Sequence, residues 1–364
     1  MAGIPLVDLR AQHRQVADDV ARGFARVLDS GCFILGPEVE AFEASFARFS
    51  DVRHCVGVAN GTDALEIALR AAGIGQGDEV IVPVNSFIAT ALAVARAGAV
   101  PVLVDCDPDH LLIDVAQVRR KIGPRTRAVV PVHLYGQMAP MEELASLGLV
   151  LVEDAAQAQG ATRRGRGPAA VAVAAATSFY PGKNLGAYGD AGALLTNDEA
   201  VACRARALRN YGSDAKYVHP ETGFNSRLDP LQAVVLSAKL AHLARWNAER
   251  RDAARRYAAL LAGVPGVVLP ATLPGNEAVW HLYVVQVPRR DDVLAKLRAA
   301  GIEAGVHYPT PIHLQGAFRA LGYRPGDFPV AEAAAARVLS LPIYPGVTPA
   351  QQERVADALR TAIG

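Results

Sequence analysis

Lys183 is the residue whose surroundings first suggest chemistry. It follows the segment Ser178-Phe-Tyr-Pro-Gly182, and positions 167 to 182 contain no charged side chain. A lysine in apolar surroundings loses solvation as an ammonium ion, so its pKa falls and its neutral amine can form an imine with an aldehyde. The alternative is a solvated loop lysine, which is the usual state of a lysine taken alone. Three neighbouring motifs favour the imine-forming lysine.

The first motif is an acid at the end of a strand. An apolar run at 149–152 predicts a buried strand, and Glu153-Asp-Ala-Ala-Gln157 follows it. Ligands of open α/β sheets bind outside the carboxyl ends of the strands, so Asp154 would face that crevice. A carboxylate there keeps a pyridinium nitrogen protonated, and Gln157 could hydrogen-bond a phenolic oxygen on the same ring. Asp154 could instead cap a following helix.

The second motif, Asn60-Gly61-Thr62-Asp63, lies between a predicted strand and a predicted helix. A glycine at a helix start allows an anion to approach the free N–H groups, and the Thr62 hydroxyl adds a donor, so the motif suits a phosphate. Ser178 could donate to the same phosphate. In the third motif, Phe87 follows the strand predicted at 79–82, where its ring could stack on a pyridine or belong to the core.

Apolar runs alternate with helical patterns along most of the chain, which is typical of a mainly parallel sheet covered by helices. We predict strands at 54–59, 79–82, 102–104, 127–132, 149–152, 174–179 and 191–195. A helix is predicted at 88–97, and a long one at 230–261 would join two domains. Beyond it, a strand at 281–287 and helices at 291–300 and 349–363 predict a small α+β domain. We expect a large domain, with an N-terminal arm, at 1–245 and a small domain at 246–364.

The bulk composition narrows the possible partners. The 37 basic and 36 acidic residues leave a net charge of +1 without a basic stripe, so we expect no nucleic-acid partner. The four cysteines are far apart and no histidine stands at metal-ligand spacing, so we expect reduced thiols and no metal. Asp8 and Arg10 interrupt the N-terminal segment, and no uncharged run reaches the roughly 20 residues of a membrane span. We therefore expect a cytoplasmic protein that does not bind membranes.

Together these motifs resemble the sugar-nucleotide aminotransferases of the DegT/StrS family. Eight segments match in order along nearly the whole chain. They are Phe33-Ile-Leu-Gly-Pro-Glu38, Gly57-Val-Ala-Asn-Gly-Thr-Asp-Ala-Leu65, Gly77-Asp-Glu-Val-Ile-Val-Pro83, Pro131-Val-His-Leu-Tyr-Gly136, Glu153-Asp-Ala-Ala-Gln157, Ser178-Phe-Tyr-Pro-Gly-Lys-Asn184, Asn225-Ser-Arg-Leu-Asp229 and His307-Tyr-Pro-Thr-Pro-Ile-His313. The resemblance implies an α/β protein of fold type I among the pyridoxal-phosphate-dependent transferases. It also implies a large domain with a mainly parallel, seven-stranded sheet and a small C-terminal α+β domain.

The resemblance also implies roles for individual residues. Lys183 would form the Schiff base with pyridoxal 5'-phosphate (PLP), while Asp154 and Gln157 would bind the ring nitrogen and the phenolic oxygen. Gly61, Thr62 and Ser178 would hold the phosphate and Phe87 would stack on the ring. An asparagine such as Asn225 reaches the phosphate from the neighbouring subunit in such enzymes, which implies a homodimer with shared active sites. Matching segments near the sugar nucleotide contribute Tyr180, Arg227, His307, Tyr308 and His313.

The reaction implied is amino transfer from L-glutamate to a nucleotide-linked keto sugar, through the pyridoxamine (PMP) form of the cofactor. The segment Val306–Gln315 resembles that of enzymes aminating dTDP-3-keto-6-deoxyhexoses, so we expect a dTDP-3-amino-3,6-dideoxyhexose product. A 4-keto sugar or an aminocyclitol precursor is the alternative acceptor. A lyase or cysteine desulfurase is disfavoured because no cysteine lies in a Gly- or Ser-rich loop. A cofactor-binding regulator would need a DNA-binding segment or a lost lysine, and a dehydrating relative would have histidine at position 183.

Overall fold

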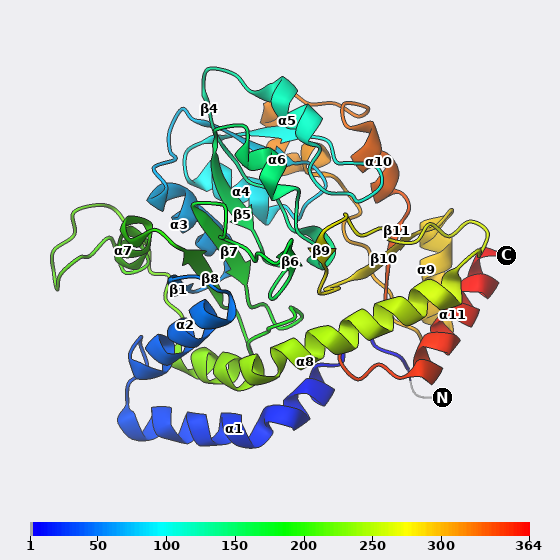
Figure 1. The fold of residues 1–364 in the computed structure, drawn as a ribbon, viewed down its shortest axis with the longest axis horizontal. Coiled ribbons are helices and arrows are strands. Elements are labelled where there is room, and N and C mark those ends of the chain that lie inside the picture. The colour runs from blue at the N-terminus through cyan, green and yellow to red at the C-terminus, as the bar shows by residue number, and fades with distance from the viewer. Residues whose placement is uncertain (1–2) are drawn as a thin grey trace.

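A central sheet of seven strands organises the computed structural model, which describes residues 3–364 (Figure 1). In spatial order the strands are β1 (His54–Val58), β8 (Gly192–Thr196), β7 (Ala174–Ser178), β5 (Val150–Asp154), β4 (Thr126–Val129), β2 (Glu79–Pro83) and β3 (Val100–Val104). The strand β8 is antiparallel to both of its neighbours, and the other neighbouring pairs are parallel. The predicted mainly parallel, seven-stranded α/β sheet is confirmed.

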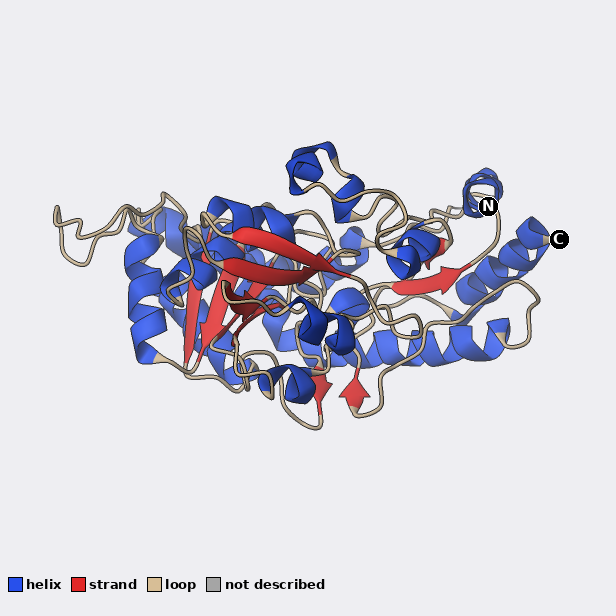
Figure 2. Ribbon diagram, turned by 90° about the horizontal axis from the view of Figure 1, so that it is seen from above, coloured by secondary structure: helices blue, strands red, loops and turns tan. Residues whose placement is uncertain are grey.

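Helices bury both faces of this sheet, as Figure 2 shows from above. Val80 and Val82 of β2 belong to one core, whereas Ile81 between them belongs to the other. Successive side chains of a strand point to opposite faces, so a strand covered on both sides is apolar throughout. The helices packed around the sheet are α2 (Pro37–Phe49), α3 (Gly61–Ala71), α4 (Ala89–Arg96), α5 (Val115–Lys121), α6 (Met141–Ala145) and α7 (Glu199–Leu208).

The helix α8 (Pro230–Leu261) runs from beneath the sheet to the C-terminal part of the molecule (Figure 1). That part has its own core, built around Tyr257, Tyr283 and Leu359. Its elements are β10 (Tyr283–Gln286), α9 (Arg290–Ala299), α10 (Pro329–Ala335), β11 (Val338–Leu341) and α11 (Pro349–Ile363), with 3-10 turns η2 (Ile312–Leu314) and η3 (Gly316–Leu321). The domain boundary at 245 falls inside α8 and stays a prediction.

Several elements were not foreseen from the sequence. The N-terminal helix α1 (Leu9–Ser30) lies along α8, and the residue Ile4 before it pairs with Ile302 of the C-terminal part. A small antiparallel pair joins β6 (Thr162–Arg163) to β9 (Asn276–Glu277), and η1 (Leu134–Gly136) is a short 3-10 turn. The segment between α7 and α8 projects from the body of the molecule (Figures 1 and 2), and Tyr217 on it is 84% exposed.

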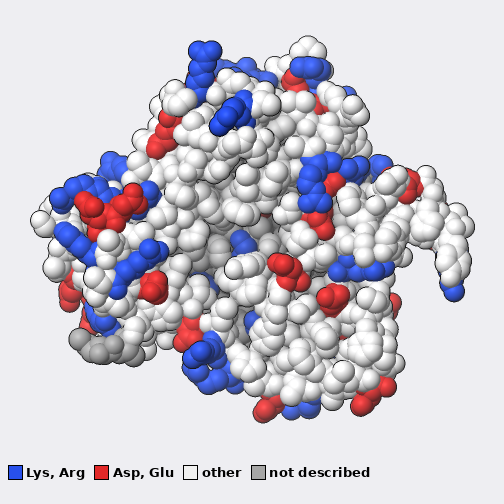
Figure 3. Space-filling view, turned by 180° about the vertical axis from the view of Figure 1, so that it is seen from behind, with Lys and Arg blue, Asp and Glu red and all other residues white. Residues whose placement is uncertain are grey.

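Three properties are relevant to possible partners: the charge on the surface, the hydropathy of the helices and the grouping of metal-ligating side chains. Side chains of both charge signs are interspersed around a central hollow on the face seen in Figure 3. Within residues 3–364, no helix combines the length and apolarity needed to cross a membrane. In the same part of the chain, no group of three His, Cys, Asp or Glu side chains is arranged to hold a metal ion.

Candidate active site

Lys183 lies in a tight turn between β7 and β8. The turn is closed by hydrogen bonds from the Lys183 amide to the Tyr180 carbonyl and from the Ala187 amide to the Phe179 carbonyl, both 2.8 Å. Gly186 is required here, because a Cβ at this position would lie 2.3 Å from the backbone oxygen of Pro181. Burial lowers the pKa of Lys183 to about 8, and the nearby Asp154 carboxylate partly opposes this effect. The sequence predicted this direction of shift.

Asp154 is the last residue of β5 and is only 6% exposed. Its Oδ2 accepts a hydrogen bond from Thr90 Oγ1 at 2.7 Å, and Thr90 in turn accepts one from Ser86 Oγ at 3.1 Å. No helix follows β5, so the alternative that Asp154 caps a helix is wrong. Thr90, which holds the carboxylate from α4, was not foreseen from the sequence. A hydroxyl in the first turn of an apolar helix gives no sequence signal of this contact.

The start of α3 offers a binding position for a group the size of a phosphate. Asn60 caps this helix by accepting a hydrogen bond from the Asp63 amide at 2.8 Å. The first N–H groups of a helix have no partner within it, so those at Gly61 and Thr62 remain available to an anion. Gly61 touches the end of β7, because a Cβ on Gly61 would lie 2.5 Å from the Cβ of Ser178. The structure thus brings the three predicted phosphate ligands together.

The amide of Gln157 has only one possible orientation. Its Oε1 accepts a hydrogen bond from the Tyr135 backbone N–H at 2.7 Å, and a backbone N–H can only donate. Nε2 is therefore the atom near Tyr308 OH, at 3.1 Å, and it remains a donor for a phenolic oxygen. The backbone of Tyr135 is left-handed, with φ 61°, and this conformation directs its N–H toward Gln157. The Leu-Tyr-Gly turn was part of a matched motif, but the role of Tyr135 was not foreseen.

Phe87 and the 306–315 segment lie together at the mouth of the crevice. Phe87 is 53% exposed, which rules out the alternative of a core phenylalanine, and its ring centroid lies 5.4 Å from that of Tyr308. His307 Nδ1 is 2.8 Å from Ser340 Oγ. Burial and the charge of Lys183 lower the pKa of His307 to about 4, so its imidazole is neutral at physiological pH. The Tyr135 hydroxyl donates to the His307 carbonyl and so holds this segment in place.

The other residues predicted to bind substrate lie in different surroundings. His313 is 3% exposed, and its Nε2 is 3.0 Å from Glu332 Oε1 while its ring packs against Phe328. These are the contacts of a packing residue, because the turn η2 directs the ring into the protein. A side chain held in this way is not available to a substrate.

Tyr180, Asn225 and Arg227 border the projecting segment or the lysine turn. Tyr180 is 60% exposed and Asn225 is also exposed, as a residue that reaches a second subunit must be. Arg227 donates to Asn210 Oδ1 at 2.9 Å and lies 5.4 Å from the ring of Tyr211. Their roles in binding stay predictions.

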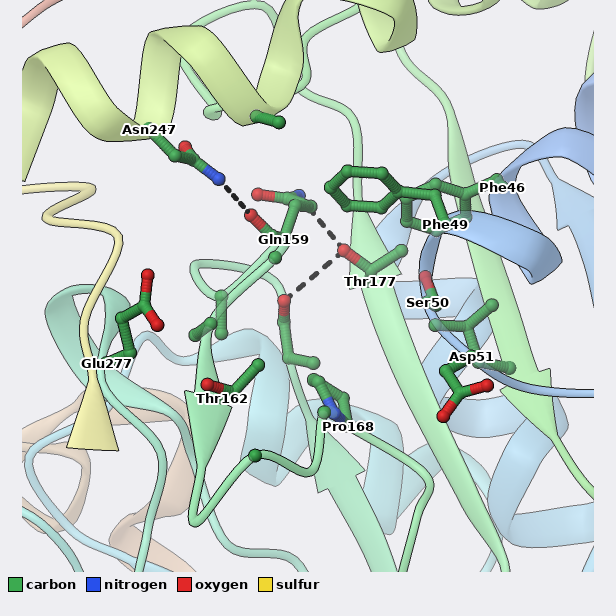
Figure 4. A pocket seen from close by; sticks show the side chains of 18 of the residues that line it. Phe46, Phe49, Ser50, Asp51, Gln159, Thr162, Pro168, Thr177, Asn247 and Glu277 are labelled. Carbon is green, nitrogen blue, oxygen red and sulfur yellow. Dashed lines mark hydrogen bonds between the residues drawn. The ribbon is translucent and has the colours of Figure 1, made fainter. Parts of the chain in front are cut away.

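A separate cavity of about 280 Å³ lies between α2, α8 and the chain that follows β5 (Figure 4). Phe46, Phe49 and Gln159 are among its lining residues. No residue that the sequence analysis assigned to the cofactor or substrate lines it. The chemistry described above lies in the crevice around Lys183 and not in this cavity.

A buried lysine, a strand-end carboxylate and a capped helix start thus converge on a mainly parallel sheet. This arrangement, on this fold, defines a PLP-dependent aminotransferase. Residues 15–360 match the model of the DegT/DnrJ/EryC1/StrS aminotransferase family, and the chain belongs to this family.

Similar proteins support this identification. The chain is 50% identical to a Streptomyces venezuelae protein named dTDP-3-amino-3,4,6-trideoxy-alpha-D-glucose transaminase, over 98% of this chain and 95% of that one. It is also 50% identical, over 98% and 99% of the two chains, to a Saccharopolyspora erythraea protein named erythromycin biosynthesis sensory transduction protein EryC1. The crystal structure of S. venezuelae DesV in complex with a ketimine intermediate superimposes with a TM-score of 0.97 at 50% identity, covering 99% and 98%.

Proposed function

We propose that this enzyme transfers the amino group of L-glutamate to C3 of a dTDP-linked 3-keto-6-deoxyhexose. The product would be a dTDP-3-amino-3,6-dideoxyhexose. The observation that carries the proposal is the full-length similarity, at 50% identity, to a transaminase named for a dTDP-3-amino sugar. That relative's product also lacks the 4-hydroxyl group, so the substituent at C4 is a second variable to be tested.

The residues of the crevice fit PLP. Asp154 offers a buried carboxylate for the ring nitrogen, and the Gln157 Nε2 donor is oriented for the phenolic oxygen. The close approach of Gly61 to Ser178 leaves the start of α3 free for the phosphate. When bound, PLP supplies an aldehyde for the amine and a ring that accepts electrons from the substrate carbon.

The chain itself moves the protons. With its pKa lowered to about 8, Lys183 has a larger neutral fraction near pH 7.5 than an ordinary lysine, so it can act as a base and then return the proton as an acid. Thr90 donates a hydrogen bond to Asp154 and so holds the carboxylate in place. His307 and Tyr308 present a neutral imidazole and a phenol to the sugar, whose hydroxyls could exchange hydrogen bonds with both.

The substrate assignment is tested by product analysis. Purified enzyme is incubated with L-glutamate and either a dTDP-3-keto-6-deoxyhexose or its 4-keto isomer. Each sugar is offered with and without the neighbouring hydroxyl group, which is on C4 of the 3-keto sugar and on C3 of the 4-keto sugar. We expect 2-oxoglutarate to form with the 3-keto sugars, and NMR to place nitrogen on C3. Nitrogen on C4, or turnover of an aminocyclitol ketone alone, would replace this acceptor while leaving the aminotransferase class intact.

Tyr308→Phe is expected to separate the two half-reactions. The substitution removes the hydroxyl near Gln157 and the crevice but keeps the ring beside Phe87. We expect the keto-sugar half-reaction to slow roughly tenfold, the size of one lost hydrogen bond, and the glutamate half-reaction to stay within about twofold. Stopped-flow absorbance of the cofactor measures both. Equal slowing of both would assign the hydroxyl to the cofactor and not to the sugar.

We further propose a homodimer whose sites are completed by Asn225 of the neighbouring subunit. The exposed position of Asn225, next to a segment that projects beyond the body of the chain, supports this arrangement. Exposed aromatic side chains at Tyr180, Tyr211 and Tyr217 offer the apolar contacts that such an interface needs.

A further inference from the structure

Two residues of the matched motifs that have no role in the site, His133 and Glu153, bind each other in the interior. Both side chains are fully buried, and His133 Nε2 lies 2.6 Å from Glu153 Oε2. His133 precedes Tyr135 by two residues, and Glu153 directly precedes Asp154. Burying a charged group costs free energy, and apolar replacements of such pairs are often as stable, so stability alone does not account for this pair.

The neighbouring backbone amides determine which atom donates in each hydrogen bond. The Ala139 N–H donates to His133 Nδ1 at 3.1 Å, so Nδ1 carries a lone pair and the hydrogen of the ring is on Nε2. His133 Nε2 therefore donates to Glu153 Oε2. The other carboxylate oxygen, Oε1, accepts from the Ala169 N–H at 3.1 Å. Glu153 thus lies between two donors and accepts from both, whereas the amide of a glutamine could accept from only one of them.

The pair joins two segments where the sheet itself no longer does. The regular ladder between β4 and β5 ends before Pro131, which has no N–H to continue it. Two backbone hydrogen bonds follow: the His133 amide donates to the Asp154 carbonyl at 3.0 Å, and the Asp154 amide donates to the Pro131 carbonyl at 2.9 Å. The bond from the His133 side chain to Glu153 is a third link at the same strand end.

Two side chains assigned to the cofactor ring depend on this junction. Successive residues of a strand face opposite sides of a sheet, so Glu153 acts on Asp154 through the backbone and not through a side-chain contact. Tyr135, two residues after His133, gives its N–H to Gln157 Oε1 at 2.7 Å. A shift of the segment that carries His133 would therefore move the backbone partner of Asp154 and the donor that orients Gln157.

We propose that His133 and Glu153 are positioning residues for the cofactor ring: their buried hydrogen bond holds segment 131–136 against the end of β5 and so sets the places of Asp154 and Gln157. The inference rests on the proposed binding of the ring by these two side chains, but it does not depend on which sugar is the acceptor. The phosphate position at the start of α3 is built from other segments. Loss of the pair should therefore weaken binding of the ring and leave binding of the phosphate unchanged.

Glu153→Gln tests this role because it keeps the shape of the side chain but offers one oxygen to two donors. His133 cannot relieve the conflict by changing tautomer while its Nδ1 accepts from Ala139. The cofactor-free protein is titrated with PMP, which forms no imine with Lys183, and then with inorganic phosphate in competition with PMP. We expect the affinity for PMP to fall roughly tenfold, the size of one lost hydrogen bond, and that for phosphate to stay within about twofold.

Glu332→Gln is the matched control. Glu332 also holds a buried histidine, with its Oε1 3.0 Å from His313 Nε2, but it lies on α10 and not in the crevice. This variant should keep both affinities. An equal loss of PMP and phosphate binding in Glu153→Gln would overturn the proposal in favour of a general structural role. An unchanged affinity for PMP would overturn it too and leave the proposed function standing, whereas a wild-type protein that binds no PMP would overturn the function.

Two substitutions of the histidine separate its two hydrogen bonds. In His133→Gln the amide nitrogen reaches the place of Nε2 and still donates to Glu153, while the acceptor for Ala139 is lost. In His133→Asn the amide oxygen replaces Nδ1 and still accepts from Ala139, while the donor to Glu153 is lost. We expect the Asn variant to bind PMP as weakly as Glu153→Gln and the Gln variant to bind it within about threefold of wild type. The opposite order would overturn the role of the bond to Glu153.

Discussion

Lys183→Ala is expected to abolish turnover, with kcat falling by at least about 10⁴-fold, because the substitution removes both the imine-forming amine and the group that moves the proton. The absorption band of the lysine-linked cofactor should disappear as well. Steady-state assays and an absorption spectrum of the reconstituted protein measure the two effects. Lys121→Ala, at an exposed position on α5, is the matched control and should behave as wild type.

A covalent adduct that still forms with the cofactor in Lys183→Ala, and that borohydride can reduce, would assign the linkage to another lysine. Lys239 would then be the first to examine. It is 2% exposed, burial lowers its pKa to about 8, and its Nζ donates to the Gly186 carbonyl at 2.6 Å, on the same turn as Lys183.

Mixing two inactive variants should restore activity if the sites are shared between subunits. In a heterodimer of Lys183→Ala with Asn225→Ala, one site combines the intact Lys183 with the intact asparagine of the other subunit, and the second site carries both substitutions. Random exchange makes half of the dimers mixed, so we expect roughly a quarter of wild-type activity. The assay follows 2-oxoglutarate after subunit exchange has been verified with differently tagged chains.

Each variant incubated with itself is the control and should stay inactive. If verified heterodimers are no more active than these controls, Asn225 acts within its own subunit or not at all. Sedimentation analysis of the wild type separately tests whether the chain dimerises.

The large domain could be predicted from the sequence because its strands are buried on both faces and therefore stand out as apolar runs. β2 was predicted at 79–82 and observed at Glu79–Pro83, and the boundaries of α8 agree. Other elements have a weaker hydrophobic periodicity and were not predicted. α1 carries many charged side chains with a narrow buried face of Val16, Val20 and Val27, and it gave no clear signal. β11 merges into a run of alanines and was also missed.

For the site, sequence patterns identified residues that stand at element ends but not those that hold them. Asp154, Gly61 and Ser178 follow from where a strand stops or a helix starts. In the structure Gly61 packs against Ser178, and Asp154 is near enough to Lys183 to affect its pKa. Thr90 and Tyr135 act across the crevice through contacts between segments far apart in the chain. His313 shows the reverse error, because a polar residue in a Pro-rich segment was expected to face the ligand and instead packs on Phe328. Only the three-dimensional path of the chain determines which way such a ring points.

The continuity of α8 limits how this enzyme can move. The helix has 32 residues, about 48 Å at 1.5 Å per residue, and contains neither Gly nor Pro after Pro230. It carries Lys239 and Asn247 against the lysine turn and Tyr257 in the C-terminal core. Because one continuous helix contacts both the lysine turn and the C-terminal core, it opposes a hinge motion between these two regions. Catalysis should therefore proceed without a slow hinge closure of these two regions, and solvent viscosity should affect kcat only through product release.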